Sequence, residues 1–111
     1  MINLLHFFKS LFQKKTSESD NNLKSIINNG AFLVDLRTAG EFELSNIPGS
    51  VNIPLSALGR NVRLFDNKKN IVLVCFSGNR SGYAKEVLEK KGVKNVINGG
   101  AWEDVKNLLE N

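Results

Sequence analysis

Short apolar runs alternate with amphipathic segments along most of this chain. The apolar runs that read as strands are 32–34, 51–53, 71–74 and 96–97. Apolar residues recur at helical spacing between them, in the segments 23–29, 38–44, 58–65, 81–91 and 102–109. Such alternation is typical of a mostly parallel sheet covered on both faces. The pattern therefore predicts an α/β fold of the doubly wound kind, with four or five mostly parallel strands and helices on both faces.

The first 22 residues follow a different pattern. Apolar residues fall on one face of a helix over residues 1–12, and residues 13–22 are polar and have the composition of a linker. We therefore divide the chain into an N-terminal amphipathic helix with a polar linker (1–22) and one domain (23–111). The helix is too short to span a bilayer. We expect its apolar face to dock on the domain or on a second copy, and contact of 1–12 with a membrane surface is the less favoured alternative.

Composition limits the chemistry that the chain can perform. Its 111 residues suit one domain, and its net charge of +4 comes from scattered lysines, so we expect no nucleic-acid partner. The single cysteine cannot form an internal disulfide, and we predict a cytoplasmic location. With one cysteine and one histidine, His6, the chain lacks the soft ligands of a zinc site, so we expect no metal and no cofactor.

The cysteine stands at a chemically informative place. Cys75 directly follows the apolar run 71–74, and a helical pattern begins at Ser81, which could cap that helix. Gly78 permits a backbone turn that points successive N–H groups at the sulfur, and these groups favour the thiolate. Arg80 adds a permanent positive charge. The segment thus predicts an anion-binding loop around a nucleophile; the alternative is that Cys75 is a small buried residue at the end of a core strand.

Three sequence blocks occur in a characteristic order. They are DLRTAGEF at 35–42, NIPGSVNIP at 46–54 and CFSGNRS at 75–81, and a weaker fourth block, GGAW, follows at 99–102. Together they resemble the signatures of the rhodanese family of sulfurtransferases, in particular its small single-domain members. The resemblance runs from about residue 23 to the end of the chain.

This resemblance implies a rhodanese-type fold and a sulfurtransferase activity. Cys75 would attack the sulfane sulfur of thiosulfate or of a persulfide donor, and the resulting persulfide would pass its sulfur to cyanide or to a thiol acceptor, either small or on a protein. The substrate-binding residues it implies are Phe76, Ser77, Gly78, Asn79 and Arg80. Asp35, Arg37 and Glu41 are expected to support the site structurally, with Asp35 bonded to backbone near the loop and Arg37 paired with Glu41.

Two departures from the family pattern affect these expectations. Asn46 stands where the family usually has histidine, and we interpret it as a structural turn contact. Phe76 stands where many members have a basic residue, so binding of dianionic thiosulfate is weakened and the donor stays open.

Two other functions remain as alternatives. One is a non-enzymatic persulfide carrier or binding module on the same fold. The less favoured one is a cysteine-loop phosphatase or arsenate reductase, whose loops carry one more residue between cysteine and arginine than residues 76–79 provide here.

Overall fold

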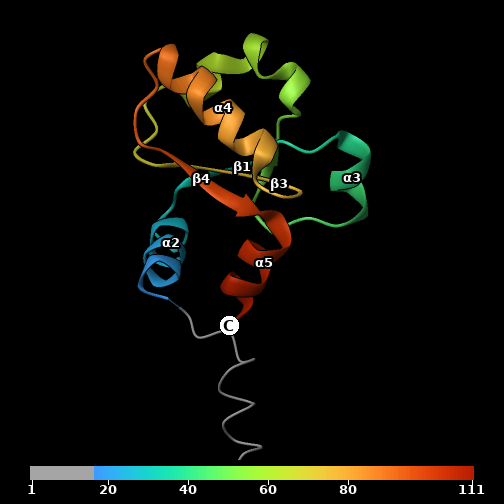
Figure 1. The fold of residues 1–111 in the computed structure, drawn as a ribbon, viewed down its shortest axis with the longest axis vertical. Helices are drawn as coiled ribbons and strands as arrows, with labels where there is room; N and C mark the ends of the chain where they lie inside the picture. The colour runs from blue at the N-terminus through green and yellow to red at the C-terminus, as the bar shows by residue number, and fades with distance from the viewer. Residues whose placement is uncertain (1–16) are drawn as a thin grey trace, which may run out of the picture.

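A four-stranded parallel sheet forms the centre of the computed structural model, which describes residues 17–111 (Figure 1). The strand order is β2-β1-β3-β4. The strands are β1 (Phe32–Asp35), β2 (Val51–Asn52), β3 (Ile71–Cys75) and β4 (Val96–Ala101). This confirms the predicted α/β fold. The helix predicted over residues 1–12 and the first part of the linker lie outside the described residues.

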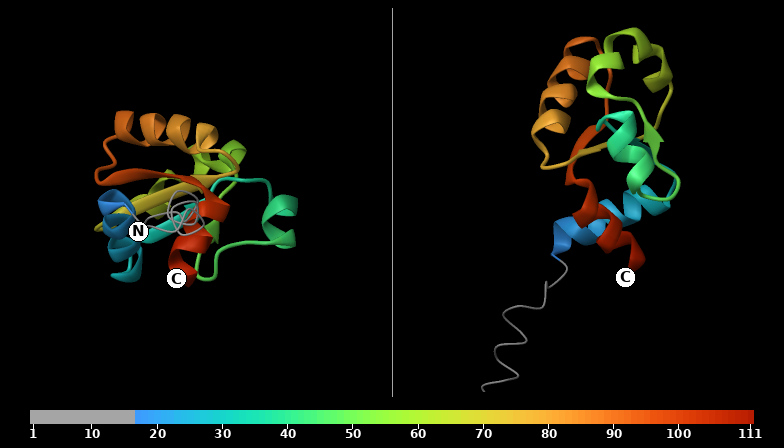
Figure 2. Two further views of the ribbon diagram at one scale, coloured as in Figure 1. Left: turned by 60° about the horizontal axis from the view of Figure 1, so that its bottom comes forward. Right: turned by 90° about the vertical axis from the view of Figure 1, so that its right-hand side faces the viewer.

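Helices cover both faces of the sheet, as predicted (Figures 1 and 2). They are α2 (Glu18–Asn28), α3 (Ala39–Leu44), α4 (Asn79–Lys90), α5 (Trp102–Glu110) and two 3₁₀ helices, η1 (Leu55–Ala57) and η2 (Gly59–Phe65). Helix α4 and the 3₁₀ helices lie on one face, α2 and α5 lie on the other, and α3 stands at the side (Figure 1). Within residues 17–111, no helix has the length and apolar character needed to cross a bilayer.

Helix α2 begins earlier than the sequence suggested. Ser17 is its N-cap: the Ser17 hydroxyl accepts a hydrogen bond from the Asp20 amide at 3.0 Å, and the Asp20 carboxylate accepts one from the Ser17 amide in return. Residues 18–22 are therefore helix, and their assignment to the linker was wrong. Their polar character reflects a capped, exposed first turn rather than an unstructured segment.

Strand β3 carries the core. All five of its residues are buried, and neighbouring side chains point to opposite faces of the sheet. Ile71, Leu73 and Cys75 pack toward α4, whereas Val72 and Val74 pack toward α2 and α5. Because β3 is a central strand covered on both sides, its last residue is fixed firmly in the core.

The carboxyl ends of three strands meet at one edge of the sheet. Asp35 of β1 lies beside Val74, and Cys75 lies beside Ala101 of β4. A bulge in β4 makes Gly99 an extra residue, and a Cβ on Gly99 would lie only 2.9 Å from Val72 Cγ1. Glycine at this position lets β4 approach β3 closely, just where the strands open onto the site.

Candidate active site

The sulfur of Cys75 is held by the loop that follows it. Cys75 is 1% exposed, and its Sγ accepts hydrogen bonds from the Gly78 amide at 3.0 Å and the Ser81 amide at 3.4 Å. The Ser81 hydroxyl lies 3.4 Å from the same sulfur. Gly78 has a φ of 95°, and this left-handed conformation turns the chain back over the sulfur. The loop therefore surrounds the sulfur with backbone and hydroxyl donors.

These donors favour the charged form of the thiol. Burial alone raises the pKa of Cys75, but hydrogen bonds from the Ser81 hydroxyl and from the amides of Ser81, Ser77 and Gly78 outweigh it. The pKa of Cys75 is consequently lowered from its ordinary value. Helix α4 begins at Asn79, directly after the turn, so its positive end also faces the sulfur. The site can thus present a thiolate, the nucleophilic form of cysteine.

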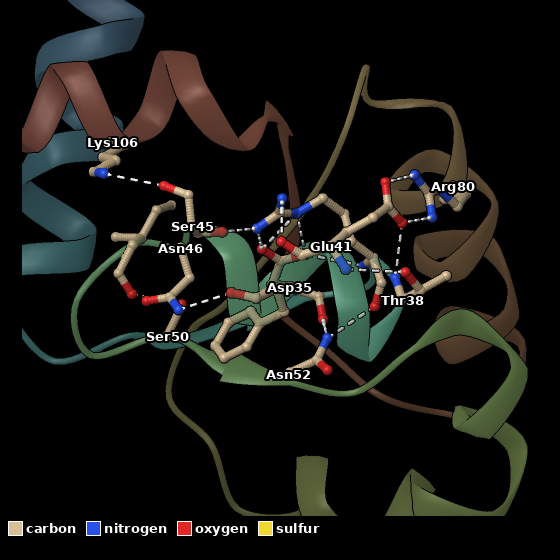
Figure 3. A network of polar contacts seen from close by, with 12 residues as sticks. Asp35, Thr38, Glu41, Ser45, Asn46, Ser50, Asn52, Arg80 and Lys106 are labelled. Carbon is tan, nitrogen blue, oxygen red and sulfur yellow. Dashed lines mark hydrogen bonds and ion pairs between the residues drawn. The ribbon is translucent and has the colours of Figure 1, made fainter.

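Arg80 is tied to α3 rather than standing free beside the sulfur (Figure 3). Its Nη1 and Nη2 atoms donate to the two carboxylate oxygens of Glu41 at 3.1 and 3.4 Å. Hydrogen bonds from Arg80, and then from the Thr38 amide, lower the pKa of Glu41 to about 2. Glu41 also completes the capping box of α3 with Thr38. The pair therefore joins the first turns of α3 and α4 across the mouth of the loop.

The predicted ion pair between Arg37 and Glu41 was wrong. Arg37 instead binds Asp35, with its Nη2 and Nε atoms 2.8 and 3.0 Å from Asp35 Oδ2. Arg37 precedes the N-cap of α3, Thr38, so it is not on the helix and the four-residue spacing does not bring its head to the Glu41 carboxylate. Only the backbone carbonyl of Glu41 is in reach, 3.3 Å from Arg37 Nη1.

Asp35 and Arg37 form a closed buried cluster at the end of β1 (Figure 3). The Asp35 carboxylate accepts the Arg37 backbone N–H at 2.9 Å, so its backbone partner is Arg37 and not the cysteine loop as predicted. Asn52 donates to the carbonyls of both residues, and Arg37 Nη2 donates to the Ser45 carbonyl at 2.7 Å. The Arg37 guanidinium lies 4.0 Å from the centroid of the Trp102 ring. We call these contacts the Asp35–Arg37 cluster.

The remaining predicted residues lie on the surface or in a turn. Phe76, Ser77 and Asn79 are exposed, and Phe76 as a residue is 64% exposed. Asn46 donates to the Phe42 carbonyl at 2.9 Å, which confirms the interpretation of Asn46 as a turn contact. The loop thus presents side chains to solvent while its amides face the sulfur.

Two residues near the sulfur, of which only Ser81 contacts it, were missed or misassigned from the sequence. Ser81 was predicted to cap the helix, but Gly78 occupies the N-cap and Ser81 is the third residue of α4, against the sulfur. Asn98 was not singled out at all, yet its Oδ1 lies 2.6 Å from the Ser81 hydroxyl. The available signal was its position, directly after the apolar run 96–97 and directly before Gly99 and Gly100.

The family of the chain follows from a match over most of its length. A model of the family described as the rhodanese-like domain matches residues 19–107. The chain therefore belongs to the rhodanese-like domain family. This agrees with the three sequence blocks, the parallel sheet and the cysteine loop described above.

Several relatives of the chain are named as sulfurtransferases or as a putative sulfur carrier. The chain is 33% identical over 85 residues to the putative sulfur carrier protein YrkF of Bacillus subtilis, covering 77% of this chain and 42% of that protein. It is 30% identical over 74 residues to the thiosulfate sulfurtransferase PspE of Escherichia coli K12, covering 65% of this chain and 71% of that protein. The structure of the human single-domain sulfurtransferase TSTD1 matches with a TM-score of 0.66 at 26% identity, covering 82% of this chain and 93% of that one.

These comparisons place the chain among sulfurtransferases and sulfur carriers in general. The chain spans less than half of the length of the Bacillus carrier protein and most of the length of the other two. The specific reaction is therefore a separate question, to be argued from the site.

Proposed function

We propose that this protein is a sulfurtransferase that works through a persulfide on Cys75. The Cys75 thiolate attacks the outer sulfur of thiosulfate or of a persulfide donor. A new S–S bond forms, the old one breaks, and sulfite or a thiolate leaves with the electron pair. An acceptor thiolate, or cyanide, then attacks the outer sulfur of the persulfide, and Cys75 leaves again as a thiolate. Both steps balance without an external oxidant or reductant.

The observation that carries this proposal is the set of donors on Cys75 Sγ. The Gly78 and Ser81 amides are fixed by the turn and by the first turn of α4, so they stabilise negative sulfur without rearranging. Burial raises the pKa of Cys75, but the hydrogen bonds from Ser81, Ser77 and Gly78 lower it by more, so the site favours the thiolate that attacks the donor. The side chains of Phe76, Ser77 and Asn79, which surround the sulfur on the loop, are exposed to solvent.

The direct test measures thiocyanate formed from thiosulfate and cyanide. The wild-type chain is expected to turn over with ping-pong kinetics, and Cys75→Ser is expected to lose activity to the uncatalysed background. Because Cys75 is the only cysteine, the substitution removes every thiol from the protein. Turnover that survives in Cys75→Ser would overturn the proposal.

A second candidate is a persulfide carrier that accepts sulfur without releasing it to small acceptors. The likeness to a putative sulfur carrier protein favours this candidate. Intact-mass analysis after exposure to a sulfane donor separates the two. A mass gain of one sulfur atom on wild type but not on Cys75→Ser, with no thiocyanate turnover, would identify a carrier.

Different sulfur donors can be ranked by the rate at which each gives thiocyanate from cyanide. Phe76 places an exposed aromatic ring, not a cation, beside the loop, and Arg80 is engaged by Glu41. We therefore expect a persulfide of a small thiol to be a better donor than dianionic thiosulfate.

A phosphatase function is disfavoured because Arg80 is already engaged by Glu41. Release of phosphate from an aryl phosphate that depends on Cys75 would reverse that conclusion. A cytoplasmic location remains part of the proposal.

A further inference from the structure

The Ser81 hydroxyl has one proton and three neighbours that could receive it. Its Oγ lies 2.6 Å from Asn98 Oδ1, 3.1 Å from the Gly78 carbonyl oxygen and 3.4 Å from Cys75 Sγ. The Gly78 carbonyl already accepts the helical N–H of Gly82 at 3.0 Å. The shortest contact, to Asn98, is therefore the main competitor of the sulfur for this proton.

Two neighbouring groups fix the orientation of the Asn98 side-chain amide, because one can only donate a hydrogen bond and the other can only accept one. The Gly100 N–H can only donate, and it donates to Asn98 Oδ1 at 3.0 Å. The Gly78 carbonyl can only accept, and it accepts from Asn98 Nδ2 at 3.2 Å. The oxygen of the amide must therefore face Ser81. Gly82 leaves room for this arrangement, because a Cβ there would lie 3.3 Å from Asn98 Nδ2.

The two charge states of the sulfur require different directions of the hydroxyl. When Cys75 is a thiol, its S–H can point at the Ser81 oxygen while the Ser81 proton points at Asn98. When Cys75 is a thiolate, the Ser81 proton must turn to the sulfur, and the bond to Asn98 is given up. Asn98 thus stabilises the protonated sulfur relative to the charged one, even though it does not touch it.

We propose that Asn98 is a positioning residue that sets the direction of the Ser81 hydroxyl proton and thereby tunes the charge state of Cys75. This inference deepens the proposed function and rests on it for its biological meaning. Once a persulfide has formed, the negative charge lies on the outer sulfur and Sγ is no longer an anion. The Ser81 proton can then return to Asn98, so one hydroxyl serves both forms of the sulfur.

The charged groups already present around the sulfur are kept in every variant of the test, and only Asn98→Asp, introduced below, adds a charge. Arg80 of α4 feels the charge of Cys75 and is paired with Glu41 of α3. Asp35 at the end of β1 is paired with Arg37. Because these pairs stay in place, a change in the titration of Cys75 reports the Ser81 hydroxyl and its neighbours.

The experiment measures how the rate of alkylation of Cys75 by iodoacetamide depends on pH. The single cysteine makes the readout specific to this site. Asn98→Ala frees the Ser81 proton for the sulfur, and we expect the apparent pKa to fall by about half a unit, as for the loss of one hydrogen bond that favoured the thiol. Ser81→Ala removes a donor to the thiolate, and we expect the apparent pKa to rise by a similar amount.

The combination of the two substitutions decides between tuning and simple loosening of the loop. In the Ser81→Ala background, Asn98→Ala is expected to leave the apparent pKa unchanged, because the proton it acts on is gone. The proposal is overturned if Asn98→Ala raises the apparent pKa, leaves it unchanged in the wild-type background, or shifts it equally in both backgrounds. Asn22→Ala, on the exposed side of α2, is the matched control and should shift nothing.

A second variant carries the test if Asn98→Ala fails to fold. Asn98→Asp keeps the size and an acceptor that faces Ser81, but it loses the donor to the Gly78 carbonyl, and its added negative charge holds the Ser81 proton more strongly. We expect it to raise the apparent pKa, and to do so less in the Ser81→Ala background, where only the charge acts. An equal rise in both backgrounds would overturn the proposal. Alkylation is read without turnover, so a failure of the proposed sulfur transfer would not be mistaken for a failure here.

Discussion

Two loops leave the same edge of the sheet and treat negative charge in opposite ways. Asp35 ends β1 and Cys75 ends the neighbouring β3, and each is followed by a turn and a helix. The Asp35 carboxylate is buried and is neutralised by Arg37, a cation from its own loop. The Cys75 sulfur is buried to the same degree, but the groups that face it are amides and a hydroxyl.

This difference separates a structural charge from a reactive one. A full cation on a buried anion makes a closed pair that has nothing further to bind, and it fixes the turn through its bonds to backbone carbonyls. Neutral dipoles stabilise a charge while leaving the sulfur free to form a bond. The one cation of the cysteine loop, Arg80, is drawn away by Glu41. The loop after Asp35 is therefore structural and the loop after Cys75 is reactive, although both leave the sheet in the same way.

The largest effect on stability is expected from removing Arg37, the cation of the structural loop after Asp35. Arg37→Ala leaves the buried Asp35 carboxylate without its partner, and breaking such a pair costs about 3–5 kcal/mol of unfolding free energy. Urea denaturation measures this loss. Arg63→Ala, on the exposed surface of η2, is the matched control, and we expect it to change stability by less than about 0.5 kcal/mol.

The contrast between the two loops would fail if Arg37→Ala lowered the free energy of unfolding by no more than Arg63→Ala does. It would also be broken if Arg37→Ala kept its stability but moved the pH dependence of Cys75 alkylation. The Asp35–Arg37 cluster would then belong to the reactive site rather than to its support.

A smaller effect on stability, with a clear effect on chemistry, is expected at Gly78. Gly78→Ala places a Cβ at a φ of 95° and 3.3 Å from Gly100 Cα, so the backbone must move. We expect a loss of about 1–2 kcal/mol in stability. We also expect a rise in the pKa of Cys75 as the Gly78 amide turns away, and a fall in transfer rate of about tenfold, less than the roughly hundredfold typical of a deleted oxyanion donor.

Gly30→Ala is the matched control for this substitution. Gly30 has a φ of 98°, but nothing lies within 4 Å of the position of its Cβ. It should therefore lose a similar amount of stability while the pH dependence of Cys75 alkylation stays at the wild-type value. If both variants shift that dependence equally, the Gly78 amide is not a specific donor to the sulfur.

The sequence predicted those features that depend on short-range pattern. The apolar runs identified β1 and β3, and the residues directly after them, Asp35 and Cys75, were correctly placed at the ends of strands. The helix predicted over residues 38–44 is confirmed as α3, with Thr38 as its N-cap and Glu41 completing the capping box. Each of these depends only on neighbours within a few positions.

The pairings that were wrong or missed depend on how the helices sit at the edge of the sheet. Glu41 meets Arg80, 39 residues away, and Ser81 meets Asn98, 17 residues away. Neither separation leaves a periodic signal. Along the chain, the carboxylates of Asp35 and Glu41 were both near enough to pair with Arg37. Arg37 pairs with Asp35 because both groups are buried together, which residue spacing does not reveal.

The smallest effect is expected at the Glu41–Arg80 pair, which is about one-third exposed on each side. Glu41→Gln keeps the capping box with Thr38 but removes the charge, and pairs this exposed are worth about 0.2–1 kcal/mol. Folding lowers the pKa of Glu41 from 4.5 to about 2, chiefly through the hydrogen bond from Arg80, so the native state favours the ionised form. The difference in unfolding free energy between Glu41→Gln and wild type should have its full size above a pH of about 4.5, and it should shrink as the pH falls toward 2.

Urea denaturation across this pH range measures that difference, with Glu43→Gln on the exposed side of α3 as the control. The substitution also frees the Arg80 guanidinium, whose charge then acts on the sulfur alone, so we expect the apparent pKa of Cys75 to fall slightly. A rise instead would mean that Glu41 orients Arg80 toward the sulfur rather than drawing it away. The cysteine loop would then rely on a cation, as the loop of Asp35 does, and the distinction between the two loops would be lost.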